Sequence, residues 1–300
     1  MNAIEIRNLS KSFRGMYAVN NLNMTVPVGA IYGFIGENGS GKSTTEKLIC
    51  GHLVPDHGEI KLFGKDYTDA GVRVRVGALI ENAGCFPGSS VYQNLMMQAI
   101  NLGLQNPNEE INRVLKIVRM EDSAHIKFKS CSLGMKQRIG IAMALLGDPA
   151  LLILDEPING LDTDGMRIMR EILVDITQTY GCTVLISSHI LGELEKIATH
   201  YGIIRQGKII QEITAKEMEN RARVFISLKT ADMQSAKMYL KEKYDNVREE
   251  EGCLRVYDVD DTEAVVEYLI QHGHVVNEIC KNKIGLEEYY IELMSQKEDE

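Results

Sequence analysis

The feature that most constrains the fold is the stretch GENGSGKST at residues 36–44, which matches the pattern GxxxxGK[ST] in full. The apolar run AIYGFIG precedes it and is typical of a buried strand, whereas TTEKLIC after it is typical of a helix. Glycines in such a loop let backbone N–H groups surround phosphate oxygens, where a Cβ atom would block the approach. This strand–loop–helix context argues against a chance match in a glycine-rich turn, so the sequence predicts a nucleotide site.

Within this loop we expect Lys42 to reach the β- and γ-phosphates and the Ser43 hydroxyl to ligate Mg²⁺. The residues expected to bind the nucleotide in this stretch are Gly36, Glu37, Asn38, Gly39, Ser40, Gly41, Lys42, Ser43 and Thr44.

Two acidic residues end a second buried strand, LLILDEP at 151–157. A carboxylate at the end of a parallel strand lies at the edge of the sheet where phosphate loops are also found. Asp155 is therefore expected to hold Mg²⁺ through water, and Glu156 to polarise an attacking water molecule. An acidic pair alone would more often be a solvated turn, but its place after a phosphate loop favours the catalytic interpretation.

A histidine follows a third apolar strand, TVLISS at 183–188. The strand delivers His189 to the same edge of the sheet, where its imidazole could bond a γ-phosphate. Position alone weighs a structural and a functional histidine equally.

The alternation of strands and helices predicts a mainly parallel α/β core. Residues 91–120 have helical periodicity that Gly103 and Asn106-Pro107 divide into two helices, and a further helix is expected from about Asp164 to Tyr180. From residue 224 the pattern changes to strand, helix, strand, helix and a last helix at about 286–296, which is typical of a small α+β unit.

Charge supports a boundary near Ala215. Residues 1–215 carry 21 basic and 22 acidic side chains, whereas residues 216–300 carry 12 and 20. The net charge of −9 argues against nucleic acid as the main partner. Six scattered cysteines without a CxxC pair indicate reduced thiols, and the lack of a signal peptide or a long apolar run predicts an intracellular, soluble chain.

The stretch CSLGMKQR at 131–138 opens the apolar run IGIAMALL. Ser132 could simply cap a core helix. The alternative is that this helix start, with Gly134 and a cluster of Lys136, Gln137 and Arg138, binds an anion.

With the phosphate loop, SLGMKQR, LLILDEP, the turn NGLD at 159–162 and His189 in this order, the chain resembles the ATP-binding subunit of ABC transporters over about residues 2–215. The resemblance implies a P-loop NTPase core with an antiparallel β subdomain and a helical subdomain at about 85–147. Residues 216–300 would form a C-terminal α+β accessory domain.

The resemblance also implies roles for single residues. Phe13 would stack on adenine, with Tyr17 as a nearby alternative. Asp155 matches the Mg²⁺-associated carboxylate, Glu156 the general base and His189 the γ-phosphate switch. The signature residues Ser132, Gly134 and Gln137 would bind the γ-phosphate of ATP on a second cassette, and Asp162 would touch that cassette's site. The functional unit would thus be a dimer of cassettes, expected to be a homodimer, with two ATP molecules between them.

Two positions depart from the family pattern. The usual LSGGQ reads CSLGM, with Leu133 and Met135 in place of glycine and glutamine. Glu81 stands where a glutamine normally ligates Mg²⁺, and its carboxylate can still coordinate a hard cation. The phrases ALIE, SLGMKQRIGIAMALL and GLEEYYIELM are most similar to the bacitracin-resistance and lantibiotic-immunity exporters.

Without a membrane span of its own, such a subunit would dock on a separate permease at the inner face of the cell membrane and power export of peptide antibiotics or other toxic amphiphiles. The docking segment holds Phe86, Pro87, Val91, Tyr92, Leu95 and Met96. We expect Phe86 and Tyr92 to be partly exposed. The alternative is a cytosolic ABC-type ATPase acting on DNA or ribosomes. The short spacing from Lys42 to Cys131 and the single cassette disfavour it, and the intact Glu156 and His189 disfavour a purely regulatory module.

Overall fold

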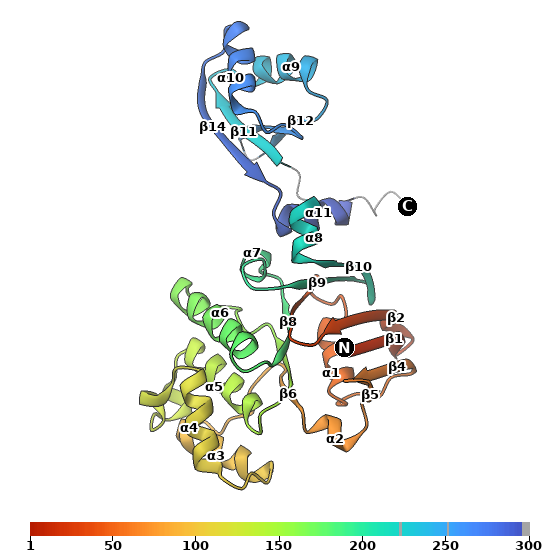
Figure 1. Ribbon diagram of the computed structural model, residues 1–300, viewed down its shortest axis with the longest axis vertical. Coiled ribbons are helices and arrows are strands. Elements are labelled where there is room, and N and C mark those ends of the chain that lie inside the picture. The colour runs from red at the N-terminus through yellow and green to blue at the C-terminus, as the bar shows by residue number, and fades with distance from the viewer. Residues whose placement is uncertain (222–223, 251, 296–300) are drawn as a thin grey trace. The chain divides into compact units, whose positions relative to one another are not determined.

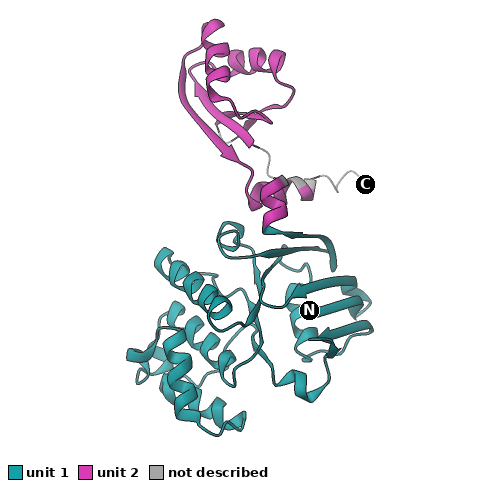
Figure 2. Cartoon of the chain, in the orientation of Figure 1, with its two compact units in different colours: residues 1–215 teal, residues 216–300 magenta. Residues whose placement is uncertain are grey.

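The computed structural model describes residues 1–221, 224–250 and 252–295. The chain forms two compact units, residues 1–215 and 216–300 (Figure 2).

A six-stranded sheet runs through the first unit in the order β10-β9-β3-β8-β7-β6. Five of its strands are parallel and only β10 is antiparallel to its neighbour, so the predicted α/β core is confirmed. The strands are β3 (Ile31–Ile35), β6 (Val76–Leu79), β7 (Leu151–Asp155), β8 (Thr183–Ser188), β9 (His200–Arg205) and β10 (Lys208–Thr214). Strands β3 and β8 are buried along their whole length, which accounts for their continuous apolar runs.

A smaller antiparallel sheet of order β2-β1-β4-β5 lies beside the first one (Figure 1). Its strands are β1 (Asn2–Phe13), β2 (Met16–Pro27), β4 (His57–Leu62) and β5 (Lys65–Asp66). One hydrophobic core joins side chains of both sheets to Leu48 and Ile49 of helix α1 (Lys42–Ile49). This packing fixes the helix that follows the phosphate loop.

Helices cover the other side of the large sheet, where α3, α4, α5 and α6 are seen together in Figure 1. The helices of this unit that follow α1 are α2 (Ala70–Arg73), α3 (Val91–Asn101), α4 (Pro107–Ile117), α5 (Leu133–Leu145), α6 (Thr163–Gln178) and α7 (Leu191–Leu194), with 3₁₀ turns at Glu121–Ser123 and Phe128–Ser130. The predicted break between α3 and α4 is present, with Pro107 at the first position of α4. Helix α6 ends two residues before the predicted limit.

The second unit is a split β-α-β motif with sheet order β12-β13-β11-β14, in which every neighbouring pair is antiparallel. Its elements are β11 (Val224–Thr230), α9 (Met233–Lys243), β12 (Val247–Glu250), β13 (Cys253–Tyr257), α10 (Thr262–Gln271), β14 (Val276–Lys283) and α11 (Leu286–Ser295), preceded by α8 (Ala215–Arg221). Strands β12 and β14 were not predicted, because both are edge strands of mainly polar sequence.

Two glycines let α5 lie close to the large sheet. A Cβ atom on Gly77 of β6 would come within 2.0 Å of the Ala144 carbonyl oxygen on α5, and one on Gly140 would come within 2.8 Å of Leu79. The approach of the helix therefore depends on the missing side chains.

We predict that Gly77→Ala lowers the free energy of unfolding by about 1–3 kcal/mol, because the added methyl group forces α5 away from β6. Chemical denaturation measures this change. The matched control is Gly192→Ala, where a Cβ atom would meet nothing within 4 Å. Equal stability of the two variants would contradict the prediction.

Candidate functional site

The phosphate loop connects β3 to α1 and requires glycine at its closest turn. Gly41 has φ +109°, and a Cβ atom there would lie 2.4 Å from the Ala18 carbonyl oxygen of β2. A larger residue would therefore push the loop away from the strand beside it.

Lys42 is held inside this loop. Its Nζ donates to the carbonyl oxygens of Gly36 at 2.6 Å and Glu37 at 3.1 Å, and the residue is only 6% exposed. The ammonium group is thus oriented by backbone oxygens and lies next to the loop's N–H groups.

A cavity of about 420 Å³ opens above the loop. Its lining residues are Ala18, Glu37, Asn38, Gly39, Gly41, Lys42, Ser43, Thr44, Asp155 and Glu156. The structure therefore brings the phosphate loop and both predicted carboxylates to one cavity, although the two segments are more than a hundred residues apart.

The carboxylate of Asp155 is fixed by the neighbouring strand. Ser187 of β8 is fully buried, and its Oγ donates to Asp155 Oδ1 at 2.9 Å. Ser187 was not identified from the sequence, since a serine within an apolar strand has no distinctive pattern.

Glu156 leaves the strand with a left-handed backbone, φ +50°. Its N–H donates to Ser187 Oγ at 3.2 Å, which holds this conformation. As a result Glu156 Oε1 lies 4.0 Å from Lys42 Nζ.

His189 contacts the other oxygen of the same carboxylate. Its Nδ1 lies 2.7 Å from Glu156 Oε2. A carboxylate only accepts, so Nδ1 carries the hydrogen and Nε2 of the half-exposed ring has its lone pair available. The third predicted element therefore lies beside the second.

Glu46 of α1 is a second residue that the sequence analysis missed. It is 0% exposed, and neither carboxylate oxygen has a hydrogen-bond partner among the described residues. Burial, with the charge of Asp155, raises the pKa of this carboxyl to about 8. The signal was a charged residue one helical turn after Lys42, in a helix that packs between two sheets.

Three predicted residues lie outside the cavity lining. Phe13 and Tyr17 are exposed near the turn between β1 and β2. Glu81, with φ +65°, instead pairs with Lys47 of α1, whose Nζ lies 2.6 Å from Oε1. This hydrogen bond lowers the pKa of the Glu81 carboxyl.

The signature segment begins α5. Ser132 is the N-cap and its hydroxyl accepts from the Met135 N–H at 3.3 Å, so the capping interpretation is confirmed. Ser132 and Leu133 are exposed, and Gln137 lines a second cavity beside Glu81. Asp162 similarly caps α6 by accepting from the Gly165 N–H at 2.8 Å. None of these side chains lines the phosphate cavity.

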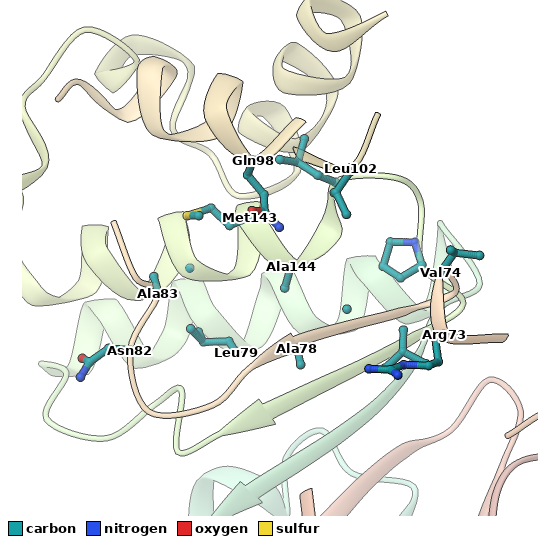
Figure 3. A pocket seen from close by; sticks show the side chains of 15 residues that line it. Arg73, Val74, Ala78, Leu79, Asn82, Ala83, Gln98, Leu102, Met143 and Ala144 are labelled. Atoms are coloured by element: carbon teal, nitrogen blue, oxygen red, sulfur yellow. The ribbon is translucent and has the colours of Figure 1, made fainter. Parts of the chain in front are cut away.

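A separate groove of about 230 Å³ lies between β6 and helices α3 and α5 (Figure 3). Gln98 and Leu102 of α3 face Met143 of α5 across it. Nearby, Phe86 is 60% exposed and Tyr92 is partly exposed, as expected, whereas Val91 and Leu95 belong to the core.

Within the described part of the chain no helix has the length and apolar character that a membrane crossing requires.

Comparison with known proteins agrees with this geometry. The model of the ABC transporter family matches residues 19–159. The bacitracin transport ATP-binding protein BcrA of Bacillus licheniformis is 34% identical over 97% of each chain. The lantibiotic transport ATP-binding protein SrtF of Streptococcus pyogenes is 39% identical over 74% of this chain and 95% of its own.

Among solved structures, CbiO1 of Clostridium perfringens, part of the ABC transporter complex CbiONQ, is 27% identical. It superposes with a TM-score of 0.67 over 73% of this chain and 91% of its own. The protein therefore belongs to the ABC transporter family, as one of its ATP-binding, ATP-hydrolysing subunits.

Proposed function

We propose that this chain hydrolyses ATP to drive a membrane exporter of peptide antibiotics related to bacitracin or the lantibiotics. The observation that carries the ATPase assignment is the convergence of Lys42, Asp155 and Glu156 on one cavity. The names of the similar BcrA and SrtF proteins support the class of cargo.

The phosphates of ATP would occupy the cavity above the loop, with backbone N–H groups and Lys42 binding their oxygens. The adenine would stack on Phe13 or on Tyr17, which are exposed and available for contact.

The donor set fits Mg²⁺. Ser43 offers a hydroxyl and Asp155 a carboxylate beside the loop. The described residues include no group of three or more potential ligands, which agrees with a cation that takes its remaining ligands from phosphate and water. When bound, Mg²⁺ would neutralise charge on the phosphates. Glu81 could join only after leaving Lys47.

Glu156 is the proposed general base. It would accept a proton from a water molecule as the water oxygen attacks the terminal phosphorus, while the bond to the bridging oxygen breaks and ADP leaves with the electron pair. The His189 hydrogen bond and the Lys42 ammonium hold its two oxygens in place. Nε2 of His189 is the proposed contact to the γ-phosphate.

A second copy of the chain would complete each site. Ser132, Gly134 and Gln137 lie outside the phosphate cavity of their own chain, and Ser132 is exposed at the start of a 13-residue helix. Such a helix start favours an anion, here the γ-phosphate held by the partner cassette. Asp162 would contact the partner beside it.

The separate permease would hold this subunit at the inner face of the cell membrane. The groove between β6, α3 and α5 and the exposed Phe86 offer a surface for a permease helix.

We predict that Glu156→Gln still binds ATP but hydrolyses it about 10²–10⁴-fold more slowly, because the amide cannot accept the proton. Phosphate release measures turnover, and size-exclusion chromatography with ATP should detect an accumulated dimer. Glu59→Gln, on exposed β4, is the control. Turnover near the wild-type rate would remove Glu156 as the base.

Ser132→Arg is predicted to abolish ATP-dependent dimerisation and turnover while ATP binding to the single chain persists, because the bulky side chain blocks the approach of the partner's phosphate. Nucleotide fluorescence and light scattering separate the two effects. Gln178→Arg, at the exposed end of α6, should change neither. If Ser132→Arg dimerises normally, the serine is only a helix cap.

Double substitution of Phe86 and Tyr92 by serine is predicted to prevent co-purification with a hydrophobic membrane subunit and to remove the tolerance to bacitracin or a lantibiotic that the wild-type pair confers. ATPase activity of the isolated chain should remain. Ile100→Ser, equally exposed on α3, is the matched control. Recovery of ribosomes or DNA in place of a membrane subunit would overturn the transport function.

A further inference from the structure

Glu46 is a buried acid that the proposed mechanism does not use. It lies on α1 one helical turn after Lys42, at 0% exposure, and neither of its oxygens has a hydrogen-bond partner among the described residues. A buried carboxyl without partners destabilises a fold, and an apolar residue would pack there at lower cost. Its presence therefore calls for a role that an apolar side chain could not perform.

The charges that act on Glu46 are those of the phosphate cavity. Asp155 and Glu156 repel a negative charge at this position, whereas Lys42 and the Ser187 hydroxyl favour it. The same Ser187 hydroxyl donates to Asp155, so it lies between the two acids. The other hydrogen bonds of Lys42 are taken by loop carbonyls. Three acids thus share one ammonium group at this end of α1.

This imbalance is what a divalent cation corrects. Placed beside Asp155, a cation supplies the positive charge that the three acids lack, and the buried location weakens screening by water. Glu46 is closed off from the cavity, so its effect passes through Asp155.

We propose that Glu46 is a positioning residue for magnesium, whose carboxylate behind Asp155 strengthens the binding of the cation. This inference rests on the proposed function, in which the cation accompanies ATP. The competing role is that of an uncharged carboxylic acid that only fills space and donates a hydrogen bond. Glu46→Gln separates the two roles, because glutamine keeps the size and the donor and removes the charge.

The test is a Mg²⁺ titration of the full chain with a fluorescent, non-hydrolysable ATP analogue, repeated in EDTA. For Glu46→Gln we expect roughly five- to tenfold more Mg²⁺ at half-saturation, the shift that loss of one nearby charge commonly produces. Binding of the analogue in EDTA should be unchanged or tighter. Glu46→Asp keeps the charge and should titrate like the wild type, and so should the exposed control Glu59→Gln.

Each remaining outcome counts against a different statement. A Glu46→Gln titration that coincides with the wild type overturns the role of Glu46. Loss of analogue binding in EDTA as well would mean that the loop itself is disturbed, which also overturns it. Binding by the wild type that does not depend on Mg²⁺ would instead contradict the proposed nucleotide–metal function. Should Glu46→Gln fold poorly, Glu46→Asp compared with Glu46→Asn repeats the comparison at constant size.

Discussion

The parallel register of three neighbouring strands is the constraint on which the site depends. Ile35 pairs with Ser188 and Asp155 with Ser187, so β3, β7 and β8 end at one level of the sheet. Parallel strands place all their carboxyl ends at the same edge, and the loop after each then meets the others. A shift of one residue in β7 would turn Asp155 to the opposite face of the sheet and separate it from the Ser187 hydroxyl.

The sequence was sufficient to predict the loop, the acidic pair and the alternation of buried strands with helices, because each has a local pattern. It was also sufficient, through the order of motifs, to predict the family. Contacts across the fold were not accessible in the same way. The left-handed backbone of Glu156, its hydrogen bond to His189 and the burial of Glu46 all depend on the register of β7 against β8 and on α1 lying between two sheets. The polar edge strands β12 and β14 escaped detection for a different reason: with few core-facing residues they lack the alternation that marks a strand.

The start of α5 illustrates how one residue can serve two purposes. The Ser132 hydroxyl accepts the Met135 N–H and so satisfies one of the free donors of the helix, while the side chain stays on the surface. Leu133, in the place of a glycine of the family pattern, packs towards the NGLD turn, since its Cδ2 would lie 3.1 Å from a Cβ atom on Gly160. The unusual spelling of the motif thus has a local packing partner within the same chain.

The ion pair of Lys47 with Glu81 joins the helix that follows the phosphate loop to the segment that follows β6. Both side chains reach solvent, so water and dissolved ions screen their attraction, and little work is needed to part them. A fastening of this kind keeps two segments in register without locking them together. Its strength falls as ionic strength rises, which makes the link between the nucleotide end of α1 and the groove beside β6 sensitive to the salt content of the surroundings.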